Sequence, residues 1–195
     1  MTIHAPPTYA VPLAKRDLVF IDLETTGLDP HENEIVELAL LRLSFDLQRT
    51  VARYETRCVA KGAATEEARA VNRYDPAKWA DAIAPADAMV HIDTWIDDTV
   101  LIVGQNTHFD WAFLRETHRR EHMALPRTKY LLDTAAIAWP LVVSGVLPDM
   151  RLETLCTYFG VSNEGAHGAM VDVERTVKVY AEMMGLKLPV GWGIP

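Results

Sequence analysis

Residues 18–28 read Leu-Val-Phe-Ile-Asp-Leu-Glu-Thr-Thr-Gly-Leu, an apolar run that ends in two acids and a set of turn residues. Continuous β-branched and aromatic residues predict a strand that is covered on both faces, as in the centre of a sheet. Asp22 and Glu24 stand two residues apart, so their side chains leave the same face of this strand. They also lie at its carboxyl end, where α/β sheets bind ligands.

The rest of the chain predicts an α/β layer around a mixed sheet. The apolar run 34–45 and the alternating run 48–59 predict an antiparallel hairpin, because only the short Asp46-Leu47 link separates them. Asp75 and Pro76 predict a helix start within a helical region at 63–97. Further strands are expected at 100–103 and 130–132, and further helices at 109–123, 133–143, 151–159 (closed by Gly160) and 169–184.

The composition is that of one soluble globular domain. The chain has 195 residues, of which 49% are hydrophobic and 24% charged, which argues against disorder. No apolar run approaches the ~20 residues that a membrane span needs, and two distant cysteines indicate a reducing compartment, so the cytoplasm is the expected location. We expect a flexible arm at 1–16, a catalytic domain at 17–185 and a tail at 186–195.

The net charge of −8 excludes a strongly basic body that would hold long duplex DNA by counterion release. A nucleic-acid partner would then have to be gripped locally, through bound metal ions for example. The charge balance therefore argues against a sequence-reading repressor and is compatible with an enzyme.

Two further acids and a histidine fall at equivalent places. Asp110 lies in the first turn of a helix that follows a buried strand, and Asp172 lies in the first turns of the last helix. His167 precedes that helix in a glycine-flanked loop. Taken singly, each has an ordinary explanation: a solvated pair at a strand end for Asp22 and Glu24, a helix cap for Asp110, and a surface side chain for His167.

Taken together, four carboxylates from three elements would crowd one edge of the sheet. Two such charges ~4 Å apart repel by about 4 kcal/mol at an effective dielectric of 20, whereas a domain holds only about 5–15 kcal/mol of net stability. No equivalent set of lysines or arginines flanks these positions in the sequence, so divalent cations are the expected neutraliser. Two ions ~3.5–4 Å apart clamp the oxygens of phosphoryl transfer, and a nearby imidazole could deprotonate water. This chemistry is metal-assisted phosphodiester hydrolysis.

Three motifs resemble those of the DEDDh (DnaQ-like) 3′–5′ exonucleases of the RNase H-like superfamily. They are Phe-Ile-Asp-Leu-Glu-Thr-Thr-Gly-Leu at 20–28, Asn-Thr-His-Phe-Asp-Trp-Ala-Phe-Leu at 106–114 and His-Gly-Ala-Met-Val-Asp at 167–172. Asp-Thr at 133–134 and Leu-Glu-Thr-Leu-Cys at 152–156 resemble the weaker connecting signals. Gln105 stands where many relatives have histidine, and 63–97 lacks their His-Gly-Ile signal. That stretch leaves one wall of the substrate groove unassigned.

The resemblance implies an RNase H-like fold: a five-stranded mixed sheet whose second strand is antiparallel, with helices on both faces. It also implies two Mg²⁺ or Mn²⁺ ions. Asp22, Glu24 and Asp172 would bind one ion, Asp22 would bridge to the second, and Asp110 would hold that one. His167 would be the general base. The implied substrate contacts are Thr25, Thr26, Gly27, Leu28, Asn106 and Phe109.

The expected function is release of nucleoside 5′-monophosphates from the 3′ end of single-stranded DNA or RNA. A polymerase or repair partner is compatible with the resemblance, and a membrane partner is not expected. Two alternatives remain open at this point: a catalytically idle module that binds nucleic acid or a polymerase, and an RNase H-type endonuclease. The loop histidine favours the exonuclease. The choice between DNA and RNA and the oligomeric state are left open by the sequence.

Overall fold

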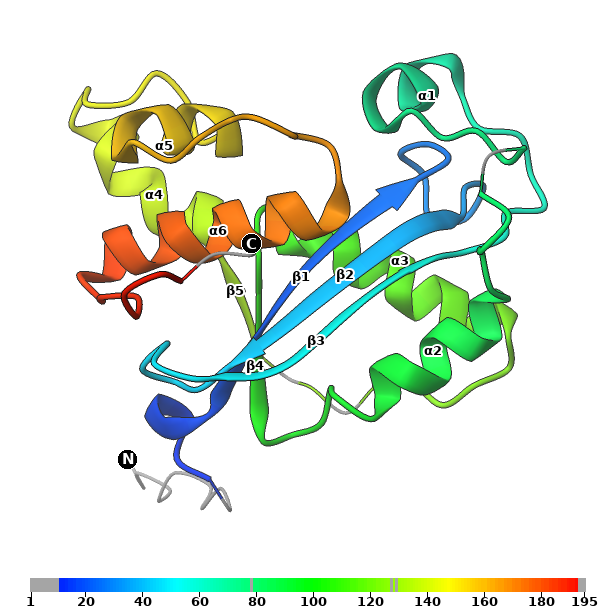
Figure 1. The fold of residues 1–195 in the computed structure, drawn as a ribbon, viewed down its shortest axis with the longest axis horizontal. Coiled ribbons are helices and arrows are strands. Elements are labelled where there is room, and N and C mark those ends of the chain that lie inside the picture. Colours follow the sequence, from blue (N-terminus) through cyan, green and yellow to red (C-terminus); the bar gives the residue numbers. More distant parts are fainter. Residues whose placement is uncertain (1–10, 78, 127, 129, 193–195) are drawn as a thin grey trace, which may run out of the picture.

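The computed structural model describes residues 11–77, 79–126, 128 and 130–192. Its five strands form one sheet in the order β3-β2-β1-β4-β5 (Figure 1). Their bounds are β1 (Asp17–Thr25), β2 (Ile35–Leu43), β3 (Thr50–Arg57), β4 (Val100–Gly104) and β5 (Leu131–Asp133). Strand β2 runs antiparallel to both of its neighbours, whereas β1, β4 and β5 are parallel. The predicted mixed sheet with an antiparallel second strand is therefore confirmed.

Helices cover both faces of this sheet (Figure 1). In the described part of the chain they are α1 (Glu66–Asn72), α2 (Pro85–Asp93), α3 (Thr107–Arg120), α4 (Thr134–Val143), α5 (Leu152–Phe159) and α6 (Ala169–Met184). The predicted end of α5 is confirmed, because Gly160 adopts the left-handed conformation there with φ of 70°. The predicted helix start at Asp75 and Pro76 is wrong. Asp75 instead closes a short turn by accepting the backbone N–H of Ala77, and α2 begins only at Pro85.

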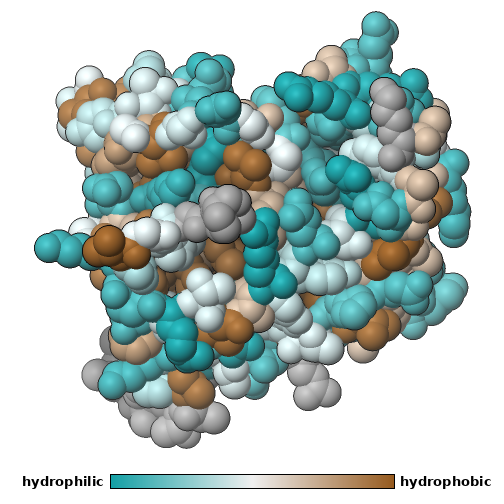
Figure 2. Space-filling view, in the orientation of Figure 1, coloured by the Kyte–Doolittle hydropathy of each residue, from teal (hydrophilic) through white to brown (hydrophobic). Residues whose placement is uncertain are grey.

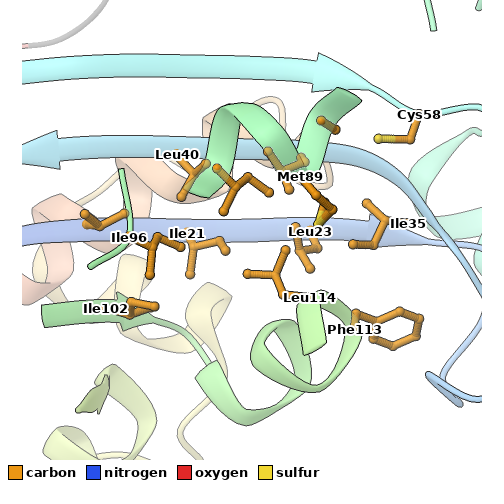
Figure 3. Packing of buried hydrophobic residues seen from close by; sticks show 14 of the residues in the cluster. Ile21, Leu23, Ile35, Leu40, Cys58, Met89, Ile96, Ile102, Phe113 and Leu114 are labelled. Carbon is orange, nitrogen blue, oxygen red and sulfur yellow. The ribbon is translucent and has the colours of Figure 1, made fainter. Parts of the chain in front are cut away.

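The alternation of side chains along β1 determines which helices pack on which face. Val19, Ile21 and Leu23 belong to the cluster formed with α2 and α3, and Figure 3 shows several of these side chains meeting between the strands and the helices. Leu18 and Phe20 point the other way, into a cluster formed with α6. Asp22 and Glu24 continue this second row toward the carboxyl end of β1. The α6 face therefore changes from apolar to acidic beyond Phe20.

A third cluster packs α4 and α5 against α6 through Ala138, Leu155 and Val179. Both cysteines are free and buried, in agreement with the expectation of reduced thiols. Within the part of the chain covered by the structure, no helix has the length and apolarity needed to cross a bilayer. In the view of Figure 2, exposed apolar groups are interspersed with hydrophilic ones.

The limits of the predicted domain stay a prediction, and the first ten residues of the predicted arm lie outside the described residues. Within the rest of that arm, Leu13–Lys15 forms one 3-10 turn and Arg16 is buried. At the other end, Leu186, Leu188 and Trp192 pack partly against the α6-facing cluster.

Candidate active site

The predicted acids come from three elements that meet beyond the carboxyl end of β1. Asp22 and Glu24 lie on β1, Asp110 lies in the first turn of α3, and Asp172 lies in the first turn of α6. A hydrogen bond locks α3 to β1, because Oδ1 of Asp110 accepts the backbone N–H of Leu23 at 3.0 Å. The side chains that the sequence predicts to converge are thus carried by the central strand and two helices on opposite faces of the sheet.

His167 stands at the entrance of this cluster. Its backbone adopts a left-handed conformation with φ of 67°, and its N–H donates to Oδ2 of Asp172 at 3.2 Å. One ligand atom each from Glu24, His167 and Asp172 lies within 4.8 Å of the other two. Glu24 and Asp172 are buried and the imidazole is exposed. This trio offers two carboxylates and an accessible nitrogen to the same point.

Burial and mutual repulsion raise the pKa values of three acids. The pKa of Asp22 lies well above its ordinary range because the group is buried and because Asp110, Asp172 and Glu24 repel its charge. Burial also raises the pKa of Asp110, although backbone N–H groups that bond the carboxylate oppose this effect. Burial, and then the charge of Asp172 and Glu37, raises the pKa of Glu24 to about 8. Each shift reports a carboxylate whose charged form is disfavoured, first by burial and then by neighbouring acids.

A fifth carboxylate, Glu37, escaped the sequence analysis. It lies on β2 directly opposite Glu24, and its Oε2 accepts the N–H of Ala169 at 3.3 Å, so it caps the first turn of α6. Its other oxygen lies 3.6 Å from Nε of Arg57. The available signal was a lone acid inside the apolar run of β2.

Asp172 has a basic partner that the sequence analysis did not name. No equivalent set of lysines or arginines flanks the four acids in the sequence, but Arg175 lies three residues beyond Asp172 on α6 and forms an ion pair with it. Arg175 is buried, with only 5% of its surface exposed. A spacing of three residues places two side chains on the same side of a helix, and this is the signal that could have found the pair.

A cavity of about 640 Å³ adjoins the acids and receives most of the predicted substrate contacts. Thr25, Gly27, Leu28 and Phe109 line it, and Leu28 is 84% exposed. The opposite wall, in a stretch that the sequence left unassigned, is formed by α1 and its N-cap residue Thr65. The residues of α1 that line the cavity are Glu67, Ala68, Val71 and Asn72. Asn72 joins the two walls, because its side-chain N–H donates to the carbonyl of Thr25 at 2.8 Å.

Thr26 and Asn106 do not line this cavity, and a role for them in substrate contact stays a prediction. Thr26 is buried, its N–H donates to the carbonyl of Glu34, and its hydroxyl accepts the N–H of Glu34, both at 2.9 Å. Asn106 precedes α3 in a left-handed conformation, and its N–H donates to Oδ1 of Asp133 at 2.9 Å. Both residues therefore stabilise the turns that carry the neighbouring predicted substrate contacts.

Arg120 fixes the loop that follows β1. From the last turn of α3, its guanidinium donates to the carbonyls of Asn33 at 2.8 Å, Pro30 at 2.9 Å and His31 at 2.6 Å. The planar fork of an arginine suits such simultaneous contacts. One wall of the cavity is thereby attached to the same helix that carries Asp110.

The raised pKa of Glu24 predicts that the metal-free protein loses stability as the pH rises. Below pH 4.5, the ordinary value, folded and unfolded chains both keep this proton; between there and pH 8 only the folded chain does. The unfolded state then binds fewer protons, so stability falls through this window. We expect the free energy of unfolding in EDTA to be lower at pH 8 than at pH 5.5 by roughly 2 kcal/mol or more. Chemical denaturation at the two pH values measures this difference, and an equal slope in Glu24→Gln would contradict the assignment.

The donor set fits hard divalent cations. Its members are mainly carboxylate oxygens, which Mg²⁺ and Mn²⁺ prefer, with a single imidazole at the rim. Arg175 balances part of the charge of Asp172, whereas desolvation and repulsion still raise the pKa values of Asp22, Glu24 and Asp110. A cation bound among these acids would relieve both costs.

Comparison with known proteins gives relatives along almost the whole chain. Ribonuclease T of Salmonella choleraesuis is 27% identical over 199 aligned residues, which cover 91% of this chain and 89% of that protein. The epsilon subunit of DNA polymerase III from Treponema pallidum is 25% identical, over 84% of this chain and 74% of that protein. The PolC-type DNA polymerase III of Mycoplasma pneumoniae is 24% identical over 86% of this chain, which spans only 12% of that polymerase.

Solved structures and a family model complete the comparison. E. coli exonuclease I in complex with a dT13 oligonucleotide matches with a TM-score of 0.74 at 20% identity, over 87% of this chain and 41% of that one. This likeness confirms the expected RNase H-like fold. The model of the RNase_T exonuclease family matches residues 19–180, which include all three motifs and every predicted site residue. The chain therefore belongs to the RNase_T exonuclease family.

Proposed function

We propose that this protein is a 3′–5′ exonuclease that releases nucleoside 5′-monophosphates from single-stranded DNA or RNA. The observation that carries this proposal is the cluster of Glu24, Asp172 and His167 beside an open, largely apolar cavity that Glu24 lines, with Asp110 of α3 hydrogen-bonded to β1. A cavity of this kind suits a terminal base and sugar, while the acids lie where the adjacent phosphodiester would reach. Similar proteins support the class of substrate: ribonuclease T, and E. coli exonuclease I in complex with dT13 and dA16 oligonucleotides.

Two Mg²⁺ or Mn²⁺ ions are the proposed cofactors. Asp22, Glu24 and Asp172 would hold one ion, and Asp22 and Asp110 would hold the other. When bound, such ions lower the pKa of water and stabilise the charge that develops on the phosphoryl oxygens. The raised pKa values of Asp22, Glu24 and Asp110 support this assignment, because these are the groups whose charge the protein leaves least compensated.

His167 is the proposed general base. Its ring is exposed at the rim of the acid cluster, so it can reach a water molecule that approaches from solvent. The imidazole takes a proton from that water as the new oxygen–phosphorus bond forms. The bond between phosphorus and the 3′ oxygen of the preceding nucleotide breaks, and a proton from solvent neutralises the departing oxygen. The product is a nucleoside 5′-monophosphate.

Phe109 is expected to support the terminal nucleotide in the cavity. Its ring is partly buried against Phe113, with 4.8 Å between centroids, and it also lines the cavity. Stacking of a base on an aromatic ring contributes about 1–3 kcal/mol, so Phe109→Ala should raise KM about tenfold and change kcat less. Steady-state kinetics on a short oligonucleotide measures the split. Trp139→Ala, which removes an exposed aromatic from α4, is the matched control, and an equal KM increase in both variants would contradict a role for Phe109.

The function is tested by incubating 5′-labelled DNA and RNA strands, and circular single strands, with the protein and Mg²⁺ or Mn²⁺. The proposal predicts a descending ladder from linear strands, nucleoside 5′-monophosphate as product, and intact circles. Cleavage of circles would favour an RNase H-type endonuclease. Binding of strands without shortening, under every metal, would favour an idle nucleic-acid-binding or polymerase-associated module. The side-by-side substrates also decide between DNA and RNA, and co-purification with a polymerase would identify the partner that the epsilon relative suggests.

A further inference from the structure

Arg175 is a buried cation whose contacts extend in two directions. One terminal nitrogen of its guanidinium, Nη1, donates to Oδ1 of Asp172, and the other, Nη2, donates to Oδ1 of Asn163. Asp172 is a proposed metal ligand on the same helix, whereas Asn163 lies in the segment between α5 and α6. The guanidinium therefore bridges a ligand and the loop that leads to His167.

Asn163 is itself anchored at its other end. Its side-chain N–H group donates to the carbonyl of Glu153 at 3.3 Å and to the hydroxyl of Thr157 at 3.1 Å, both on α5. The chain of contacts thus runs from α5 through Asn163 and Arg175 to Asp172. All of its members belong to the helices and the loop on the α6 side of the sheet.

Both oxygens of the Asp172 carboxylate are held in this way. Arg175 bonds Oδ1, and the backbone N–H of His167 donates to Oδ2 at 3.2 Å. A carboxylate that accepts from two sides has little freedom to rotate about its own bond. The loop from Asn163 to His167 is also fastened at both ends to the same pair of groups, so the orientation of Asp172 and the place of His167 are set together.

If only its charge mattered, Arg175 would weaken the binding of a metal ion. A guanidinium beside a ligand repels a cation and competes for the carboxylate, so its removal would strengthen metal binding. Geometry works the other way, because groups that orient a ligand typically raise metal affinity or activity by about 10- to 100-fold. Lysine separates these effects: it keeps the positive charge but lacks the planar fork that reaches two acceptors at once.

We propose that Arg175 and Asn163 form a positioning bridge that orients Asp172 for metal binding and places the His167 loop. This inference rests on the proposed function, because it assumes that Asp172 binds a catalytic ion. Neither residue touches substrate or the reacting atoms. The bridge sets how tightly Asp172 can engage an ion and how well His167 is placed.

The test measures Mn²⁺ binding to the metal-free protein, by calorimetry, in wild type, Arg175→Lys, Asn163→Ala and the double variant. The bridge predicts that Arg175→Lys raises the Mn²⁺ dissociation constant about tenfold or more. Asn163→Ala, which leaves the charge and the Asp172 pair in place, should raise it in the same direction. The double variant should be no weaker than Arg175→Lys, because both changes break one chain of contacts. At saturating Mn²⁺, kcat should fall in all three.

Arg42→Lys is the matched control, since Arg42 is a half-buried arginine paired with Asp17 at 3.0 Å at the opposite end of β1. It should leave Mn²⁺ binding and kcat unchanged. Wild-type Mn²⁺ affinity in both Arg175→Lys and Asn163→Ala would overturn the bridge. The bridge would also be overturned if Arg175→Met bound Mn²⁺ more tightly than the wild type while Asn163→Ala kept the wild-type affinity. If Arg175→Lys fails to fold, Asn163→Ala alone decides. Absence of nuclease activity in the wild type would instead overturn the proposed function.

Discussion

Replacing Asp22 by asparagine should abolish activity while making the metal-free protein more stable. In the proposed site Asp22 would serve both ions, so its loss would remove several kcal/mol of charge stabilisation. Each 1.4 kcal/mol is about tenfold in rate, so kcat should fall by about 10³-fold or more. Asp22 carries a pKa raised by burial and by four neighbouring acids, so its charge opposes folding at neutral pH. We expect the free energy of unfolding in EDTA to increase by more than about 1 kcal/mol.

The control for this variant is Asp17→Asn. Asp17 is the first residue of β1, at the end of the strand opposite to the acid cluster. Asp17 pairs with Arg42 outside the acid cluster, so its removal should leave kcat unchanged and lower stability slightly. Single-turnover nuclease assays and chemical denaturation in EDTA provide the two measurements. Full activity in Asp22→Asn, or a loss of stability larger than in Asp17→Asn, would contradict the proposed role.

Replacing His167 by glutamine should lower kcat by about 10²- to 10⁴-fold, the usual contribution of a general base. The remaining reaction would depend on hydroxide, so the rate of the variant should keep rising with pH where the wild type has levelled off. Binding of Mn²⁺ by the acids should persist, because their oxygens are untouched. A pH–rate profile combined with Mn²⁺ calorimetry on the same sample measures both effects.

His91→Gln is the matched control for that experiment. His91 lies on α2, on the opposite face of the sheet, and its ring packs 5.1 Å from that of Tyr54. Its replacement should leave the pH–rate profile unchanged. A His167 variant whose profile parallels the wild type, lowered uniformly or not lowered at all, would show that another group removes the proton.

Local signals in the sequence were enough for the strands and for the acids that the motifs carry. The continuous run of β-branched and aromatic residues predicted the buried strand β1. The common face of Asp22 and Glu24 followed because a strand has a fixed period of two. Helix α6 and the end of α5 followed from an apolar stripe and a glycine. The helix start at Asp75 failed because an Asx turn uses the same residues as a helix cap, and only tertiary contacts decide between them.

The groups that the sequence missed act across elements. Glu37 on β2 accepts a hydrogen bond from Ala169 on α6, which is 132 residues away in the sequence. Arg120 donates to carbonyls of a loop that is 87 to 90 residues away. No local pattern encodes such distances. Arg175 is different, because it lies one turn from Asp172 and was within reach of a helical reading. The acids as a group have no matching set of basic residues in the sequence, whereas the spacing of three residues on a helix indicates this single pair.

The most direct test of a dication site among these acids is titration of the metal-free protein with Mn²⁺ at pH 7, repeated in buffers of different ionisation enthalpy. We predict two ions per chain and release of protons on binding, because Glu24, with its pKa of about 8, and Asp22 must give up protons to bind metal. Asp22→Asn should lose most of this uptake. If a folded sample takes up no Mn²⁺, or if Asp22→Asn binds it as tightly as the wild type with the same proton release, these acids do not form a catalytic metal centre.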